Sequence, residues 1–448
     1  MADLFEDVGD EGGGAGREGA RRKAPGAPRL REPVRDEATF QVCDLDSLLD
    51  ETHPARLIWA YASKVDLSDL EAQVKAREGV AGMPQTSLHL LLALWLYATT
   101  RGVGSARALA RLCESEAPFR WLCGGVSVNH RMLSEFRAQE GERANRLLTQ
   151  HVASLSHAGL INLDEIAQDG VRVRANAGTK SFRRRKTLEE ELARAKALLA
   201  RLSKDEDDDP GASGKRQAAA RKRAAREREA RVRAALEALA EAEKVREKRL
   251  KSNRAKERSR AEPRASTTDP EARVMKMADG GFRPAYNLQF ASLPETGIVV
   301  AVSCGNVGSD RALAEPMAQA IKTAYGRRAD VYLVDGGYMA REDIEAAEQA
   351  GTRLYCPATK SKWGVERYAP RRDDTPAIAQ WRKRMDSEEG RLTYKRRSRC
   401  ELVHARFRNL GLDRLWVRGR KKVKACACWF ALAANILVEA RLRAATMA

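Results

Sequence analysis

The sequence lacks the patterns that would place it among zinc-finger or secreted proteins. Its eight cysteines and six histidines are scattered, with no CxxC pair, so the usual zinc-ligand spacings are excluded. Free thiols in a reducing cytosol are the expected state. The first residues, MADLFEDVGDEGGG, lack the basic-then-apolar pattern of a signal peptide. We therefore expect a cytoplasmic protein.

The chain also has no apolar run of full membrane-spanning length. Its longest run, ACACWFALAANILV at 425–438, is about two-thirds of a span and lies between Lys424 and Glu439. This run predicts a buried core helix, and no membrane partner is expected.

What the sequence does have is length and positive charge. Its 448 residues, 43% of them hydrophobic, suit two or three domains with real cores. It contains 81 Lys and Arg against 62 Asp and Glu, a formal net charge of +19. Such an excess favours a polyanionic partner, with nucleic acid first and an anionic membrane surface second.

Composition then divides the chain. Residues 1–36 are rich in Gly, Pro, Glu and Arg and predict a disordered tail. Helical patterns fill residues 37–160, including an apolar run entered at Ser87. Within 104–139, a short helix, a break at the glycines 124 and 125, and a second helix entered at Ser127 or Asn129 fit either a DNA-reading helix-turn-helix or ordinary packing. We predict an N-terminal all-α domain that binds DNA.

Residues 186–262 form a strongly charged insertion. Ala, Glu, Lys, Arg and Leu dominate residues 186–260, and DDDPGASG at 207–214 interrupts them, which predicts an antiparallel helical hairpin. Residues 183–260 hold 26 Lys and Arg against 15 Asp and Glu, and 26 − 15 = +11 is more than half of the net charge. The insertion is either a solvated arm or an arm that binds DNA.

The remaining residues, 161–185 and 263–448, predict a mixed α/β sheet. Strand-like alternation fills 161–178 and is expected to end at Asp169 and Gly170. Further strands are expected at 285–293, 297–306, 331–335 and 354–358, and helices at 310–326, 341–350, 378–389 and 394–410.

Two strand ends in this region carry an Asp-Gly pair. Asp169 precedes Gly170, and Asp335 follows VYLV and precedes Gly336. Asp-Gly pairs commonly begin turns. Alternatively, carboxylates at neighbouring strand ends form a site for hard ions such as Mg²⁺ or Mn²⁺, to which Glu401 would add a third oxygen ligand. The competing carboxylates are Asp164, Glu165, Asp279, Asp310 and Asp343.

Glu401 lies in the expected helix YKRRSRCELVHARFRNL. At about 100° per residue, Tyr394, Arg397, Glu401 and Arg408 fall within a sector of about 60°. This face suits a metal ligand flanked by phosphate-binding groups. It equally suits an ordinary surface helix with an i, i+4 Arg–Glu ion pair.

These four residues, as Tyr-x2-Arg-x3-Glu-x6-basic, resemble the Tyr-Arg-Glu-Lys signature of bacterial insertion-sequence transposases of the DDE type. The final Lys of the signature is Arg408 here. Four other segments also resemble segments of this family and occur in the same order: AQDGVRVRANAG, TDPEARVMKMADGGFRPAYNLQ, VYLVDGGY and RGRKKVKACACWFALAANI. The resemblance as a whole runs from about Phe40 to the C-terminus.

The resemblance implies an RNase H-like fold of the retroviral-integrase type, with Asp169, Asp335 and Glu401 as a catalytic triad. The triad would bind two Mg²⁺ or Mn²⁺ ions, and Tyr394, Arg397 and Arg408 would contact DNA. The implied function is a DNA transposase that cuts double-stranded DNA at the ends of its element and joins them to target DNA, as a homo-oligomer. The alternatives are a nuclease of the same fold without strand transfer, and a domesticated DNA-binding protein without activity.

Overall fold

A computed structural model describes residues 44–74, 76–77, 79, 83–138, 142–204, 212–250, 262–358 and 366–447. All of them belong to one structural unit, Asp44–Ala448. The tail predicted at 1–36 lies outside the described residues.

The N-terminal region is helical, as predicted. Ser87 caps α3, its hydroxyl accepting from the Leu90 amide, and nearly every side chain of α3 is buried. Asn129, rather than Ser127, begins α6, since its side chain accepts from the amides of residues 131 and 132. The helices are α1 Pro54–Ala62, α2 Ser68–Glu71, α3 Leu88–Thr100, α4 Ala106–Ser115, α5 Ala117–Cys123, α6 His130–Ala138 and α7 Arg143–His157.

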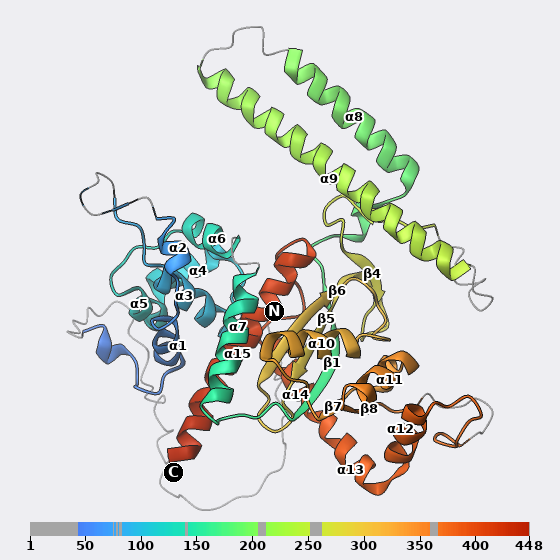
Figure 1. Ribbon diagram of the computed structural model, residues 1–448. Helices are drawn as coiled ribbons and strands as arrows, with labels where there is room; N and C mark the ends of the chain where they lie inside the picture. Colours follow the sequence, from blue (N-terminus) through green and yellow to red (C-terminus); the bar gives the residue numbers. More distant parts are fainter. Residues whose placement is uncertain are drawn as a thin grey trace, which may run out of the picture. The chain divides into compact units, whose positions relative to one another are not determined.

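A mixed sheet forms the centre of the second region (Figure 1). Its strands are β1 Glu165–Arg174, β4 Arg273–Lys276, β5 Phe282–Ser292, β6 Val299–Gly305, β7 Val331–Leu333 and β8 Arg353–Tyr355. Strand β5 runs antiparallel to β1, β4 and β6, whereas β7 is parallel to both β1 and β8. The order β6-β5-β1-β7-β8 is consistent with an RNase H-like domain and confirms the α/β class.

The helices of this region largely follow the prediction, with one correction. They are α10 Ala314–Tyr325, α11 Arg341–Gln349, α12 Pro376–Asp386, α13 Glu388–Lys395, α14 Arg399–Asn409 and α15 Arg420–Met447. The single helix expected at 394–410 is interrupted by a 3-10 turn, η4, at Arg396–Ser398. A 3-10 turn has about 3.0 residues per turn instead of 3.6. The angular positions calculated for one regular helix therefore do not hold across Arg397.

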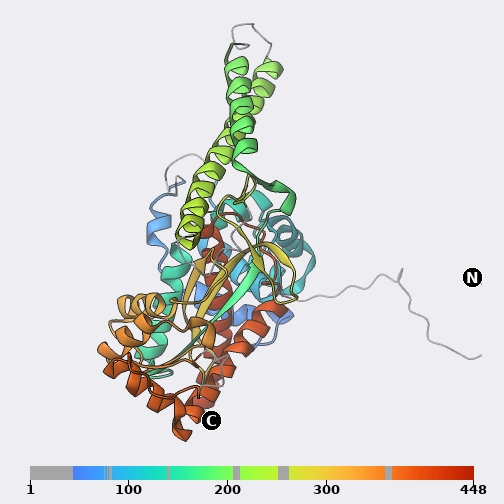
Figure 2. The ribbon, with the colours of Figure 1, turned by 90° about the vertical axis from the view of Figure 1, so that its right-hand side faces the viewer.

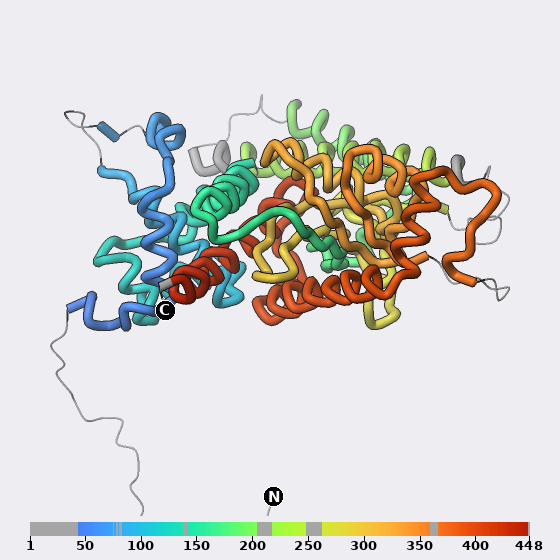
Figure 3. Tube along the Cα trace, turned by 60° about the horizontal axis from the view of Figure 1, so that its bottom comes forward, coloured from blue at the N-terminus to red at the C-terminus, as the bar shows by residue number. Residues whose placement is uncertain are grey.

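Helix α15 contains the longest apolar run. Over Arg420–Thr446 it is long and apolar enough to cross a membrane, but 67% of its most apolar window is buried within the protein. It packs against α7, α3 and β6, and Figure 3 shows it beside α7. The run therefore forms a core helix, as predicted.

The insertion forms a helical hairpin, as predicted. Helices α8 Arg185–Lys204 and α9 Ala212–Leu250 run side by side in both Figure 1 and Figure 2. They share a small apolar core of their own: Leu188, Val232, Ala235 and Leu239, together with Ala265. A two-stranded sheet of β2 Phe182–Arg183 and β3 Ala265–Ser266 joins the two ends of the insertion.

Candidate active site

The pairing of β1 with β7 brings two of the predicted carboxylates together. The parallel register joins Glu165 to Val331 and Ala167 to Leu333, a constant offset of 331 − 165 = 166 residues. Asp169 and Asp335 differ by the same 335 − 169 = 166 residues. Extending this register by two residues places Asp169, within β1, level with Asp335, which follows the end of β7.

The two Asp-Gly pairs differ in their local structure. Asp335 caps the 3-10 turn η3 (Gly336–Tyr338), and its Oδ1 accepts from the Gly337 amide at 2.6 Å. The turn interpretation is thus confirmed there, although it leaves the other carboxylate oxygen for further contacts. The expectation that β1 ends at Asp169 is wrong, because the strand continues to Arg174, paired with β5 throughout.

Close packing explains why glycine follows Asp169. A Cβ atom at Gly170 would lie 2.3 Å from Nε2 of Gln289 and 2.7 Å from Oδ1 of Asp310. Any larger residue would have to displace these two side chains. Gly170 therefore lets the polar side chains beneath β1 reach the strand that carries Asp169.

Two arginines of η4 and a histidine of α14 cover the face of β1 that carries Glu165 and Asp169. Arg396 Nη2 lies 2.5 Å from Glu165 Oε2. Arg397 Nη1 lies 3.7 Å from Asp169 Oδ2, and His404 Nδ1 lies 3.5 Å from the same oxygen. The tertiary fold thus places the 394–409 segment directly over the first predicted catalytic aspartate.

Arg397 is the centre of this arrangement. Its Nη2 donates to Glu401 Oε1 at 3.0 Å, and its side chain is only 16% exposed. Burial opposes its charge, but Tyr394, Asp169, Asp335 and Glu401 raise the pKa of the guanidinium above its ordinary value. The i, i+4 Arg–Glu pair anticipated as an alternative is therefore present. Unlike in an ordinary surface pair, the arginine is largely buried and also reaches Asp169.

Asp169 and His404 both have displaced pKa values. Burial raises the pKa of Asp169 to about 6, opposed by the Gly170 amide and Arg397 and assisted by Asp335 and Asp310. Burial lowers the pKa of His404 to about 4, with further lowering by Arg408 and Arg397. His404 is thus neutral at neutral pH, and among the described residues its buried Nε2 has no hydrogen-bond partner.

Glu401 and Arg408 lie more toward solvent. The Glu401 side chain is 64% exposed and contacts Asp169 only through the shared Arg397. Arg408 is exposed on α14, four residues after His404. Within the described part of the chain, no three His, Cys, Asp or Glu side chains are already spaced to hold a metal ion. The metal-binding triad therefore stays a prediction.

Sequence reasoning missed a buried hydrogen-bond network that lies beside the two aspartates. Gln289 lies at its centre: Oε1 accepts from Gln168 Nε2 at 2.8 Å and from the Tyr338 hydroxyl. Its Nε2 donates to Asn287 Oδ1 at 3.1 Å and to Asp310 Oδ1 at 2.8 Å. All four hydrogen-bonding positions of the Gln289 amide are thus used, which fixes its orientation.

The network joins the segments on which the two aspartates sit. Gln168 precedes Asp169 and accepts at Oε1 from the Tyr332 hydroxyl of β7 at 2.8 Å, while Tyr338 lies three residues after Asp335. Burial keeps the pKa of Tyr338 far above its ordinary value, so its hydroxyl stays protonated and donates. The available sequence signal was AYNLQF, in which two amides, Asn287 and Gln289, stand two residues apart in an otherwise largely apolar strand.

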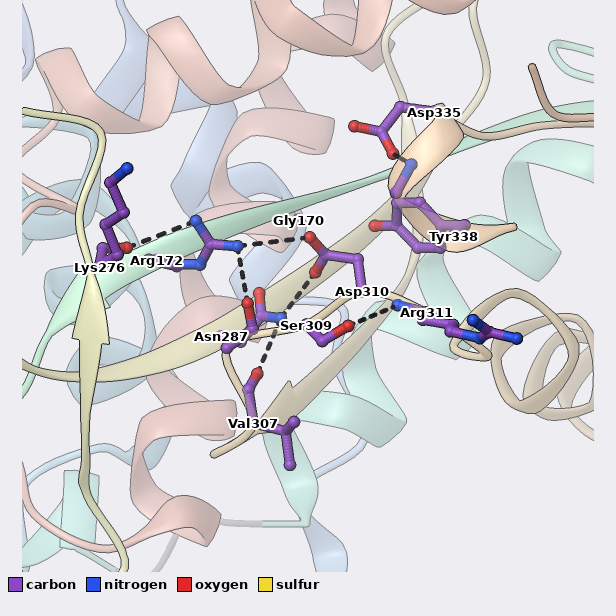
Figure 4. Close-up of polar contacts among 12 residues, drawn as sticks. Gly170, Arg172, Lys276, Asn287, Val307, Ser309, Asp310, Arg311, Asp335 and Tyr338 are labelled. Atoms are coloured by element: carbon purple, nitrogen blue, oxygen red, sulfur yellow. Dashed lines mark hydrogen bonds and ion pairs between the residues drawn. The ribbon is translucent and has the colours of Figure 1, made fainter. Parts of the chain in front are cut away.

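Asp310 is the competing carboxylate that the fold brings to this site. Figure 4 shows it beside Arg172 and Asn287, with Nη2 of Arg172 3.7 Å from its Oδ2 and Nδ2 of Asn287 2.7 Å from its Oδ1. The other competing carboxylates contact residues outside this network: Asp164 pairs with Arg327, Glu165 with Arg396 and Asp279 with Arg283, and Asp343 accepts from the Glu315 amide.

Two family models match the chain. The Transposase DDE domain matches residues 259–436, and the Transposase domain (DUF772) matches residues 43–139. The chain belongs to the DDE transposases. The first match contains Asp335 and Glu401 but begins after most of the hairpin, so Asp169 lies outside it. The Tyr-Arg-Glu-Lys signature stays a prediction. No curated protein matches the transposase, and neither does any solved structure.

Replacing Arg397 by Ala is expected to reduce DNA cleavage by the transposase about 10- to 100-fold, the range for a residue that holds reacting groups in place. The reason is that Arg397 contacts both Asp169 and Glu401. The matched control is Arg396→Ala, which removes the neighbouring and more exposed guanidinium bound to Glu165. Equal cleavage by the two variants would show that the 394–408 face is an ordinary surface with ion pairs and has no role in cleavage.

Proposed function

We propose that the transposase cuts double-stranded DNA at the ends of its element and joins those ends to target DNA, in a reaction that depends on Mg²⁺ or Mn²⁺. The observation that carries this proposal is the parallel register of β1 with β7, which, extended by two residues, brings Asp169 level with Asp335; Glu401 is linked to Asp169 through Arg397. In this proposal Asp169, Asp335 and Glu401 are the metal-binding and catalytic residues.

The donor chemistry of these residues fits a hard divalent ion. All three offer carboxylate oxygens, the ligands that Mg²⁺ and Mn²⁺ prefer. Burial is the largest cause of the raised pKa of Asp169, and the nearby charges of Asp335 and Asp310 raise it further. A divalent cation would relieve that repulsion. When bound, two such ions would activate the attacking water or 3′-hydroxyl and stabilise the leaving oxygen.

The protein's own residues would position the DNA strand. Arg397 uses part of its five-donor guanidinium for Glu401, and the remaining donors suit a phosphate oxygen. Tyr394 is half-buried beside Arg397, where its ring would pack against the bound strand. Arg408 offers an exposed charge farther along α14. The neutral His404 would hold Asp169 without competing for the phosphate.

A product assay separates the candidate functions. Labelled DNA carrying the element ends is incubated with target plasmid and Mg²⁺, with EDTA as the negative control. Joined products are expected from the transposase. Cut but unjoined DNA would favour the nuclease, and binding without cleavage would favour the domesticated DNA-binding protein. Analytical ultracentrifugation of the DNA complex tests the proposed homo-oligomer.

Metal binding has a readout that does not depend on catalysis. Ions that bind only the folded chain raise its melting temperature by mass action. Mg²⁺ or Mn²⁺ is therefore expected to raise the melting temperature of the unmodified protein, and to raise that of Asp335→Asn much less. An equal rise in both proteins would place the bound ion away from Asp335.

A further inference from the structure

The positive charge of the hairpin is concentrated in one half. We define the distal half as 192–204 of α8 and 212–233 of α9, next to the connection between the helices, and the proximal half as 185–191 and 234–250. The distal half contains thirteen Lys and Arg against two Glu, whereas the proximal half contains six against seven. The excess charge of the two helices therefore lies in the distal half.

The proximal half holds the two helices together and fastens the hairpin to the domain. Its Arg185 pairs with Glu243 across the two helices. Arg273 Nη2, from β4, donates to the Ala238 carbonyl at 2.9 Å. The proximal half, with its balanced charges and these contacts, therefore attaches the hairpin to the domain.

The exposed side of distal α9 is basic. The residues of α9 can be placed around the helix axis at about 100° per residue, with Arg221 set to 0°. The buried Ala225, Val232, Ala235 and Leu239 then lie within about 40° of Arg221. The exposed Arg223, Arg226 and Arg233 lie between about 120° and 200°, on the opposite side. Among the hairpin residues whose side chains are described, the exposed large hydrophobic residue is Val245, in the proximal half. The distal half thus offers charge, and not an apolar surface, to a partner.

We propose that this distal basic surface binds the phosphate backbone of duplex DNA, and that it is not an oligomerisation surface. The proposal rests on the proposed function, which supplies DNA as the substrate. The 22 residues of distal α9 extend about 33 Å, close to one turn of B-DNA at about 34 Å. Guanidinium groups bind phosphate oxygens through paired hydrogen bonds. The connection itself contains five acidic residues at 205–209, so the contact runs along α9.

The test compares two triple variants that remove the same net charge. The distal variant is Arg223→Gln, Arg226→Gln and Arg233→Gln. The proximal control is Lys186→Gln, Lys244→Gln and Arg246→Gln. Dissociation constants for a random-sequence 30-base-pair duplex are measured between 50 and 200 mM salt, with circular dichroism and melting temperature to verify folding.

The distal variant is expected to lower the slope of log affinity against log salt by up to about 2.7, or about 0.9 for each phosphate that the variant no longer neutralises. The control is expected to keep the slope of the unmodified protein. Equal slopes in the two variants would overturn the proposal, as would a change of oligomeric state in the distal variant. Failure of the unmodified protein to cut and join DNA, with its salt slope intact, would contradict the proposed function and not the DNA-binding surface.

Discussion

Replacing Asp169 by Asn is expected to give a protein that is more stable than the unmodified transposase and unable to cleave DNA. The pKa of this carboxyl is raised by burial to about 6. Between about pH 4 and 6 the folded chain retains a proton that the unfolded chain releases, so the free energy of unfolding falls as pH rises through this window. Asn carries no charge, so the variant keeps the free energy of unfolding that the unmodified protein loses in this window. The difference is about 1–3 kcal/mol above pH 6.

The same substitution removes a proposed metal ligand. Metal ions contribute several kcal/mol of transition-state stabilisation, and 1.36 kcal/mol corresponds to a tenfold change in rate. Cleavage by Asp169→Asn is therefore expected to fall by about 10³-fold or more, as is cleavage by Asp335→Asn and Glu401→Gln. Melting temperatures are compared at pH 4, 6 and 8 in EDTA, so that bound metal does not stabilise the unmodified protein.

The matched control for stability is Asp279→Asn. Asp279 lies in the exposed turn between β4 and β5, where the Gly281 amide and Arg283 hold the pKa of its carboxyl below the ordinary value. Asn at this position is not expected to raise the melting temperature at any pH. If Asp169→Asn behaves like this control, the carboxyl of Asp169 is not destabilised by burial. If it retains full cleavage, its catalytic assignment is wrong.

Replacing Gln289 by Leu is expected to have the second large effect, on both stability and cleavage. Leu approximates the size of Gln but cannot bond to the Tyr338 hydroxyl or to Oδ1 of Asn287. Each buried polar group left without a partner costs about 1–3 kcal/mol. The free energy of unfolding should therefore fall by at least about 2 kcal/mol, measured by denaturant titration.

Cleavage by the Gln289→Leu variant is expected to fall about 100-fold, because a shift of about 1 Å in reacting groups has this effect. The control is Gln349→Leu, on the exposed surface of α11. A double-mutant cycle with Tyr338→Phe should show a coupling energy of about 0.5–3 kcal/mol. Normal cleavage by a destabilised Gln289→Leu variant would show that the network supports the fold without positioning the aspartates.

Much of the architecture followed from local patterns in the sequence. The apolar run that became α15, the caps of α3 and α6, and the break between α8 and α9 depend on neighbouring residues, so composition and spacing predicted them. Asp335 at the end of a buried strand was predicted for the same reason. The basic character of the insertion was also visible in the sequence, but the division of its charge between an attached half and an exposed half required knowing how α8 and α9 pack.

Only the tertiary structure decided the site. The parallel pairing of β1 with β7 places Asp169 level with Asp335 across 166 residues, including the whole hairpin, and no local pattern specifies that register. The same holds for Arg397 between Asp169 and Glu401, and for Gln289 under Gly170. These contacts join segments far apart in the chain. They depend on how strands pair and helices pack, which is why the sequence predicted candidate carboxylates but not the groups that contact them.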